Sequence, residues 1–326
     1  MDALSEVLRL ARFSADVVLD GHGRGPWCVS VPASGSVARA HLVLEGECAL
    51  RAAGGVEARL PAGTLAFLAH GDAHLLATSN DADAVPFSAL LRSPVAGELV
   101  PVSLGKGGAP TRWISIAVSC ERHFADPLLA ALPATMVCDL LGAPALNWLT
   151  GALGLHLSAS DAPAVGEGAK RERLAELVLL EALRRHVHAV PPGRNGWLAG
   201  LNDRYVGRTL ALVHARPSEP WTVERLGRQV GLSRSALAER FSAVMGEPII
   251  AFLTRWRLQL AAESLLATPR SVESIAREAG YESASAFSHA FRRAFRKPPS
   301  VWRKKKGSDP FSMLQRAERS GKRKGI

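Results

Sequence analysis

The stretch from Thr222 to Phe295 contains one residue pattern twice. Each copy begins with a hydroxyl residue and a short segment of regularly spaced apolar residues. A glycine, a serine and a longer segment of regularly spaced apolar residues follow. Gly231 and Gly280 are 49 residues apart, and the later positions are 50 apart because the second turn has one more residue. An internal repeat restricts the fold more strongly than composition does, because each copy must form the same supersecondary unit.

Each copy predicts two helices joined by a glycine turn. Thr222 and Ser233 are suited to cap the two helices of the first copy, and Ser271 and Ser283 those of the second. This order is typical of a helix-turn-helix unit, whose second helix lies in the major groove of DNA. A helix of about 17 residues, roughly 26 Å long, is predicted within 248–266, which suits two reading helices in successive groove segments about 34 Å apart.

The apolar residues of each second helix determine which side faces the protein interior. They recur every four residues, at Leu237, Phe241 and Met245 and again at Phe287, Phe291 and Phe295. The opposite side must face outward, where small and hydrogen-bonding side chains can approach base edges and nearby arginines can neutralise phosphate. The outward residues are Ser235, Ala238, Glu239 and Ser242 in the first copy and Ala284, Ser285, Ser288, His289 and Arg292 in the second.

The net charge of +10 is concentrated around the repeat. It is −3 over residues 1–197, +7 over 198–303 and +6 over 304–326. A basic C-terminal half indicates nucleic acid as a partner, or less often an anionic membrane. A helix-turn-helix shape also occurs in bundles that never bind DNA, but two copies in a basic segment favour DNA. The tail over 304–326 is expected to be disordered, with added salt-dependent DNA affinity as the alternative.

Residues 198–303 resemble the DNA-binding domain of the AraC/XylS family of bacterial transcription regulators. The motifs that carry the resemblance are Trp221-Thr-Val-Glu-Arg-Leu, Gly231-Leu-Ser-Arg-Ser-Ala-Leu-Ala-Glu-Arg-Phe241, Trp256-Arg257, Ile275-Ala276, Gly280-Tyr-Glu-Ser283, Ala286-Phe-Ser-His-Ala-Phe-Arg292 and Pro298. Two residues depart from the family pattern. His289 stands where arginine is common, and Arg296 stands where glycine often ends the last helix.

The resemblance implies specific DNA-contacting residues. The base-reading positions are Ser235, Glu239, Ala284, Ser285, Ser288 and His289, and the residues expected to contact phosphate or support the reading helices are Arg234, Arg240, Arg292 and Arg293. Glu239 either reads cytosine or pairs with a neighbouring arginine, and we favour the pairing. Double-stranded promoter DNA is the implied partner.

The segment from Trp27 to about His123 has a different sequence pattern, in which short runs of β-forming residues are interrupted by Gly and Pro. The runs cover 27–31, 41–44, 47–51, 56–60, 65–69, 74–78, 87–91 and 114–119. Such a series predicts an antiparallel sandwich or barrel. Helices are predicted over 4–13, over the Leu-rich 127–157 and over 169–188. The apolar stripe of 169–188 either packs in the core or builds a dimer interface.

Two of these segments, 41–51 and 61–74, resemble the paired motifs of the cupin barrel. In the second, Thr64 stands where Asp is usual and Ala69 where Pro is usual. The resemblance implies His41 and His74 as candidate metal ligands, with Glu45 or Glu47 as a less certain third. A catalytic metal site needs about three protein ligands, and a third clear histidine is missing. We therefore expect no metal and no cofactor, and a barrel that packs side chains or holds a small organic effector.

The remaining composition excludes several classes of protein. The cysteines Cys28, Cys48, Cys120 and Cys138 form no CxxC pair, which excludes a disulfide scaffold or structural zinc site and favours core cysteines. The N-terminus has no signal-peptide pattern, and no apolar run approaches the roughly 18 residues of a membrane span. A cytoplasmic, soluble protein without a membrane partner is expected.

Together these features predict an α+β two-domain chain. A cupin-like antiparallel β-barrel with flanking helices over 1–190 senses or dimerises, a linker covers 191–197, and an all-α double helix-turn-helix domain covers 198–303. The predicted function is a DNA-binding transcription regulator and not an enzyme. A homodimer is expected, with RNA polymerase and a small-molecule effector as further candidate partners. The alternatives are a metal-dependent cupin oxygenase or isomerase using His41, His70 and His74, and a constitutive regulator without ligand.

Overall fold

The computed structural model describes residues 3–35, 37–52, 55–79, 81–91, 99, 101–120, 122–141, 147–148, 150–154, 166–191 and 196–304. The chain forms two compact units, and each is described separately. The β-sheet unit comprises Arg12–Arg122 and Leu132–Ala189. The helical unit comprises Met1–Ala11, His123–Ala131 and Val190–Ile326. The charged tail after residue 304 and residues 192–195 of the expected linker lie outside the described residues.

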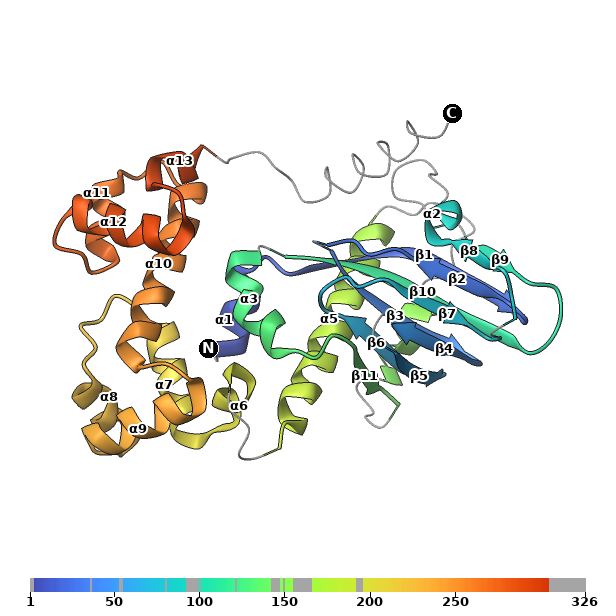
Figure 1. The fold of residues 1–326 in the computed structure, drawn as a ribbon, viewed down its shortest axis with the longest axis horizontal. Coiled ribbons are helices and arrows are strands. Elements are labelled where there is room, and N and C mark those ends of the chain that lie inside the picture. Colours follow the sequence, from blue (N-terminus) through green and yellow to red (C-terminus); the bar gives the residue numbers. More distant parts are fainter. Residues whose placement is uncertain are drawn as a thin grey trace. The chain divides into compact units, whose positions relative to one another are not determined.

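Two sheets make up the β-sheet unit (Figure 1). The larger sheet has the strand order β11-β6-β3-β10-β1-β9 and the smaller one the order β5-β4-β7-β2-β8. The strands of the larger sheet are β1 (Ser14–Arg24), β3 (Ala38–Glu45), β6 (Thr64–Leu68), β9 (Val102–Leu104), β10 (Pro110–Ser119) and β11 (Met136–Asp139). Those of the smaller sheet are β2 (Cys28–Val31), β4 (Glu47–Ala52), β5 (Val56–Pro61), β7 (His74–Ala77) and β8 (Ala84–Pro86).

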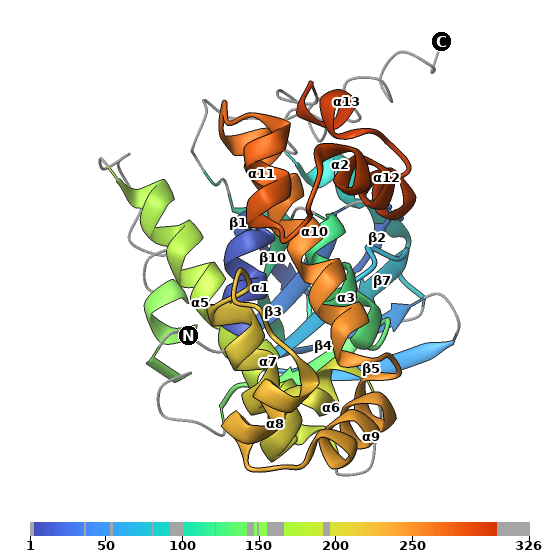
Figure 2. The ribbon, with the colours of Figure 1, turned by 90° about the vertical axis from the view of Figure 1, so that its left-hand side faces the viewer.

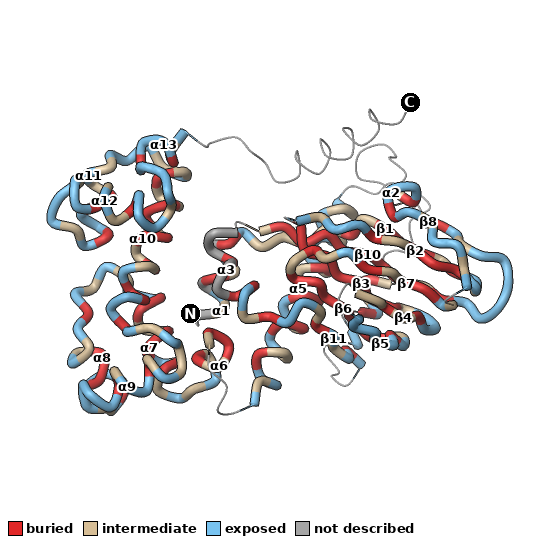
Figure 3. The backbone as a smooth tube through the Cα atoms, in the orientation of Figure 1, coloured by how far each residue is buried: buried red, intermediate tan, exposed pale blue. Residues whose placement is uncertain are grey.

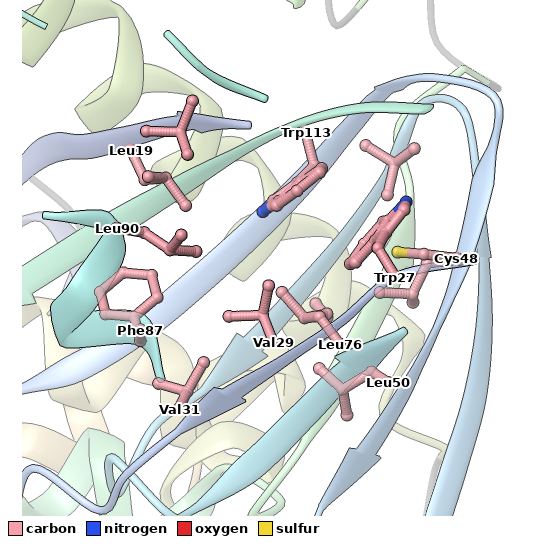
Figure 4. Packing of buried hydrophobic residues seen from close by; sticks show 14 of the residues in the cluster. Leu19, Trp27, Val29, Val31, Cys48, Leu50, Leu76, Phe87, Leu90 and Trp113 are labelled. Carbon is pink, nitrogen blue, oxygen red and sulfur yellow. The ribbon is translucent and has the colours of Figure 1, made fainter. Parts of the chain in front are cut away.

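The core of this unit lies between the two sheets and contains a stacked pair of tryptophans (Figure 4). The ring centroids of Trp27 and Trp113 are 4.3 Å apart, and the ring planes are tilted by 13°. Two glycines of β1 make room for them. A Cβ atom on Gly21 would lie 2.3 Å from Trp113, and one on Gly23 would lie 2.1 Å from Trp27. The core therefore requires glycine at both positions.

The predicted two-domain α+β fold is confirmed, and the sheets are compatible with a cupin fold. The strands described here do not close into the expected barrel, because β9 and β11 stay at the edges of one sheet and β5 and β8 at the edges of the other. The pairing is also not wholly antiparallel. β9 runs parallel to β1, and β8 runs parallel to β2.

Three local predictions in this half were wrong. The run over 87–91 forms the helix α2 (Phe87–Leu90), because Phe87 and Leu90, one helical turn apart, both enter the core. The eleven-residue strand β1 was missed because its glycine-rich end resembles a loop. The Leu-rich 127–157 is not simply helical, since it contains the end of α3 (Arg122–Ala131) and the strand β11.

The helix α5 (Glu167–Ala189) confirms the prediction over 169–188 and packs against β1 and β11. Its buried face consists of Ala175, Val178, Leu179, Ala182, Leu183 and Val187. Two leucines lie on the other side of the helix. Leu177 is 46% exposed and Leu180 is 39% exposed, so part of the apolar stripe faces solvent within the described chain.

The helical unit contains two helix pairs joined by one long helix, as predicted (Figure 2). Its helices are α1 (Ala3–Leu10), α3, α6 (Trp197–Asn202), α7 (Arg204–Ala215), α8 (Val223–Val230), α9 (Arg234–Met245), α10 (Ile249–Ala267), α11 (Val272–Glu278), α12 (Ala284–Phe295) and α13 (Pro299–Arg303). The helices α8 and α9 form the first helix-turn-helix unit and α11 and α12 the second. α10 has 19 residues and connects them.

The four predicted helix caps are all present. Thr222 and Ser233 accept backbone N–H bonds at 3.1 and 3.2 Å, from Arg225 and Ala236 respectively. Ser271 and Ser283 accept the corresponding bonds of the second unit, each at 3.1 Å. Each cap satisfies a helix N–H group that has no partner inside its own helix.

The fold continues past Pro298 and Pro299. Pro299 begins the short helix α13, which buries Trp302. The Trp302 ring lies 4.9 Å from Phe295 between centroids, and its Nε1 donates a 3.2 Å hydrogen bond to the carbonyl of Ala262. A proline at the first position of a helix costs no hydrogen bond, so the two prolines start a helix instead of ending the domain.

Candidate nucleic-acid interface

The second helix of each unit is anchored by the apolar face that the sequence predicted. Leu237, Phe241, Phe287 and Phe291 are completely buried, while Met245 and Phe295 are partly buried at the helix ends. This orientation leaves one side of α9 and one side of α12 toward solvent (Figure 3).

On α9, the two implied base-reading residues lie on the exposed side. Ser235 is exposed, and its Oγ lies 3.3 Å from the Oγ of the capping Ser233. Glu239 is exposed one turn later and makes no ion pair with any described residue. The arginine pairing that we favoured for Glu239 is therefore absent from the described chain, and its carboxylate remains available to accept a hydrogen bond.

On α12, the four implied residues lie along the first turns of the helix. Ser285 and His289 are exposed, whereas Ala284 and Ser288 are partly buried. Arg292 continues the same stripe one turn after His289 and is exposed. The structure thus brings the predicted residues of the second unit together on one surface, although Ala284 and Ser288 offer less of their side chains than expected.

The four implied arginines differ in their surroundings. Arg234, Arg292 and Arg293 are exposed, at the start of α9 and in the last turn of α12. Arg240 instead forms a fork with Asp203, with its Nη2 2.8 Å and its Nε 3.0 Å from Oδ2. Its guanidinium also lies 5.2 Å from the Tyr205 ring centroid. Arg240 is thus held against α7.

Asp203 has two structural roles. Its Oδ1 accepts N–H bonds from Tyr205 and Val206 at 3.0 Å, which caps α7. Burial raises the pKa of Asp203, but the hydrogen bonds from Arg240 and from the two amides outweigh burial, so that the pKa lies below its usual range. Sequence reading missed Asp203, although an aspartate directly before a predicted helix is a recognisable capping signal.

Arginine–carboxylate pairs occur in both helix-turn-helix units, and in the second unit Arg270 pairs with Glu278 at 2.6 Å. Around α8 and α9, Arg225 pairs with Glu219 at 2.5 Å, and Arg255 pairs with Glu247. On α12, by contrast, no carboxylate among the described residues lies within 4.0 Å of Arg292 or Arg293. Exposed positive charge without an internal partner is what a surface for nucleic acid requires.

Arg257 on α10 lies against the segment before the first helix-turn-helix unit and against the turn of the second. Its Nε and Nη2 donate hydrogen bonds of 2.8 Å to the carbonyls of Pro217 and Glu219, which lie just before the first unit. A Cβ atom on Gly280, in the turn of the second unit, would lie 2.9 Å from Nη1 of Arg257. No local sequence pattern assigns Arg257 a contact of this kind, because its partners are backbone carbonyls 38 and 40 residues away.

The candidate metal ligands His41 and His74 do meet, in the interior of the β-sheet unit. Their Nε2 atoms are 2.7 Å apart, and both side chains are buried. The Nδ1 of His74 lies 2.8 Å from the carbonyl of Asp72 and must carry a proton. The Nε2 of neutral His74 therefore accepts from His41, whose Nδ1 accepts from the hydroxyl of Ser115 at 2.9 Å.

This arrangement does not fit a shared metal ion. Two nitrogens at about 2.1 Å from one tetrahedral zinc are about 3.4 Å apart, which is longer than the observed separation. No group of three His, Cys, Asp or Glu among the described residues could hold a metal. Glu45 and Glu47 are exposed, and Glu47 pairs with Arg59 at 2.5 Å. The two histidines instead complete each other's hydrogen bonds.

The cysteines carry no site in the described chain. Cys28 and Cys48 are buried, as predicted, and Cys120 and Cys138 are partly buried. Burial raises the pKa of the Cys48 thiol to about 12, which keeps it protonated. No helix among the described residues is long and apolar enough to span a membrane.

Two family matches cover most of the chain. Residues 2–188 match a family described as Cupin, and residues 226–305 match one described as Helix-turn-helix domain. The first match extends over the sheets and α5, and the second covers both reading helices and the α10 connection.

Relatives with known names match along nearly their full length. An AraC-like transcription regulator of Streptomyces lividans is 32% identical over 317 residues, which cover 93% of this chain and 98% of its own. The HTH-type transcriptional regulator AlkR of Acinetobacter baylyi is 26% identical over 307 residues, which cover 93% of this chain and 99% of its own. A solved AraC-type transcriptional regulator from Chromobacterium violaceum is 26% identical, with a TM-score of 0.30, over 31% of this chain and 89% of that one.

Proposed function

Since this chain belongs to the AraC-like transcription regulators that join a cupin domain to a helix-turn-helix domain, we propose that it regulates transcription from specific promoter sites through α9 and α12. The N-terminal domain would sense an effector or join two protomers. Promoter DNA as partner would place the protein in the cytoplasm of a bacterial cell, and RNA polymerase would be its second macromolecular partner.

The observation that carries the proposal is the matching exposure of α9 and α12. Each helix follows a capping serine, buries one apolar face and leaves the opposite side open. In the first unit this side presents Ser235 and Glu239, and in the second Ser285 and His289. Hydroxyl, carboxylate and imidazole groups can read base edges in the major groove.

The connecting helix suits the simultaneous use of both units. α10 has 19 residues, which corresponds to roughly 28 Å at 1.5 Å per residue. Successive major-groove segments on one face of a duplex are about 34 Å apart. We infer that one protomer contacts two adjacent groove segments, with different residues at each, so the site within each protomer is asymmetric.

For the N-terminal domain, the solvent side of α5 supports a homodimer. Its residues follow a two-fold pattern in which Arg173, Glu176 and Leu177 are mirrored by Arg184, Glu181 and Leu180. In an antiparallel pair of such helices, Leu177 would meet Leu180 of the second protomer. Glu176 of one protomer would then lie near Arg184 of the other, one turn away.

The base-reading role can be tested with operators selected from a random duplex library by the full-length protein. The double variant Ser288→Ala/His289→Ala should weaken binding to the selected operator roughly 10-fold or more, because each good base contact contributes about 1–3 kcal/mol of discrimination. Its affinity for unselected duplex should change much less. Ser300→Ala, an exposed change on α13, is the control. Equal losses for operator and unselected duplex would rule out base reading by these two residues.

The competing function, a metal-dependent enzyme with an accessory DNA domain, would need the histidine pair to open around a metal. Its test is metal analysis of the purified full-length protein. A stoichiometric content of iron, manganese or zinc that is lost in the His74→Ala variant would favour the enzyme. The hydrogen-bonded pair of His41 and His74 favours a regulator without that chemistry.

A further inference from the structure

The reading helix of the second unit ends at an unusual residue. α9 ends at Gly246, whose φ is 76°, whereas α12 ends at Arg296, whose φ is 57°. These positions correspond in the repeat, with the offset of 50 residues. A left-handed backbone favours glycine, because a Cβ atom crowds the neighbouring carbonyl. Among the described residues, only Arg12 shares a positive φ without being glycine.

Arg296 lines an open hollow on α12. The hollow has a volume of about 770 Å³, and its other lining residues are Ala286, His289, Ala290, Arg292 and Arg293. The two alanines leave space between the longer side chains. Three arginines and one histidine therefore line a single concave surface, and all of them come from one helix and its cap.

Nothing acidic in the described chain balances this cluster. No described carboxylate lies within 4.0 Å of Arg292, Arg293 or Arg296. In the first unit, by contrast, Arg225 and Arg240 are both paired with carboxylates. Cations held close together repel one another unless an anion joins them, so the hollow is suited to a negatively charged partner from solution.

The position of the hollow indicates which anion that partner carries. His289, an outward residue at the centre of the proposed reading face, is also part of the lining. When a helix enters the major groove, the phosphates of the groove edge pass beside it, and guanidinium groups bind phosphate through paired N–H donors. An open, shallow surface fits a phosphate on a duplex better than an enclosed small molecule.

We propose that Arg296 binds a backbone phosphate of DNA, together with Arg293, at the edge of the groove that α12 enters. This inference rests on the proposed DNA-binding function. It adds a DNA contact at Arg296, which the sequence pattern identified only as the residue that ends the helix. The strained backbone is retained because glycine at this position would cap the helix well but would leave the phosphate without its guanidinium.

The test uses the full-length protein with Arg296→Gly and Arg296→Gln, and a fluorescent 30-bp duplex of mixed sequence. Binding is measured by anisotropy across a series of KCl concentrations. Loss of one phosphate contact should reduce the slope of log K against log salt by about 0.9, which corresponds to a roughly eightfold weaker affinity at 0.1 M. Arg296→Gly should also raise the melting temperature. Weaker binding by a more stable protein excludes unfolding as the cause.

The control is Arg208→Gln, which removes the same charge from an exposed position on α7. An unchanged slope in both Arg296 variants would overturn the proposal, as would an equal loss of slope in the control. Normal DNA binding with impaired recruitment of RNA polymerase would assign the hollow to a protein surface and also overturn it. If the wild-type protein bound no duplex at any salt concentration, the proposed function itself would fail.

Discussion

The Nε2 atoms of His41 and His74 lie 2.7 Å apart and join the two sheets of the β-sheet unit by a hydrogen bond. His41 belongs to β3 and His74 to β7. The chain of bonds runs from the hydroxyl of Ser115 through both rings to the carbonyl of Asp72. Every ring nitrogen has a partner only while both imidazoles are neutral, since a second proton would place two donors against each other.

The first prediction is that acid lowers the stability of the β-sheet unit through this histidine pair. Burial lowers the pKa of His41 well below its usual range, with His74 and Arg39 adding to the effect, and burial also lowers the pKa of His74. The unfolded chain therefore binds more protons below about pH 6.5, and stability is lost as the pH falls from there toward the folded-state pKa values. The loss should approach 1.4 kcal/mol per pH unit for each histidine.

Urea unfolding followed by the near-ultraviolet signal of the stacked tryptophans measures this effect between pH 7.5 and 5. His70→Gln, which changes a histidine outside the pair, serves as the control and should retain the acid sensitivity. A double variant, His41→Leu/His74→Leu, should lose most of it. Identical pH profiles for the double variant and the wild type would contradict the assignment to this pair.

The second prediction is that Gly21→Ala destabilises the β-sheet unit. The added Cβ would lie 2.3 Å from the Trp113 ring, which cannot move away because it is stacked on Trp27. Inserting a methyl group into a closely packed core costs about 1–3 kcal/mol. Thermal unfolding should show a lower midpoint, whereas Gly151→Ala, which meets nothing within 4 Å, should not. Equal midpoints for the two variants would argue against the close approach.

The third prediction separates the two roles of Asp203. Asp203→Asn keeps an N-capping residue but weakens the charged fork with Arg240, whereas Asp203→Ala loses both. Loss of the cap should cost about a further 1 kcal/mol in the alanine variant. Release of Arg240 should increase non-specific DNA affinity and steepen the salt slope by up to about 0.9 in the asparagine variant. A salt slope identical to wild type would mean that freed Arg240 does not reach phosphate.

The fourth prediction compares two turn glycines with nearly the same φ angle. Gly231 and Gly280 have φ values of 82° and 81°. An alanine at Gly231 meets nothing within 4 Å and should cost about 1 kcal/mol through backbone strain alone. An alanine at Gly280 also presses on Arg257, which is held by two carbonyls. Gly280→Ala should therefore lower the melting temperature more and weaken DNA binding, and the reverse ranking would count against the role of Arg257.

The fifth prediction tests the solvent side of α5. Leu177→Arg should convert a dimer into a monomer, because a second protomer would have to bury the new charge beside Leu180. Sedimentation of the full-length protein measures the change. Val56→Arg, which alters a residue on β5 that is 45% exposed, is the matched control and should leave the assembly intact. A wild-type protein that sediments as a monomer at all concentrations would exclude this interface.

How much of the fold could be predicted varied between the two halves for a physical reason. In the helical unit, Ser233, Ser283, Gly231 and Phe287 act on neighbours a few residues away, so local patterns were sufficient. In the β-sheet unit, β1 contains two glycines that suit a loop in isolation and a strand only beside tryptophans. No local signal distinguishes these two cases.

The candidate site shows the same contrast between local patterns and contacts of distant segments. Periodicity placed Ser285 and His289 on the outward side of α12, and the structure agrees. It could not show that Arg240 is held by Asp203, 37 residues earlier, or that Arg296 adopts a left-handed backbone beside two other arginines. Those facts depend on where α7 and the helix end lie in space.

Local sequence patterns were therefore enough to predict the repeat, its caps, its apolar faces and the concentration of positive charge around it, because each of these arises from residues close together in the chain. The contacts of His41 with His74, of Trp27 with Trp113 and of Arg240 with Asp203 could be known only from the three-dimensional arrangement of the chain. Contacts between distant segments depend on packing and on the competition between alternative partners, which no short pattern of residues records.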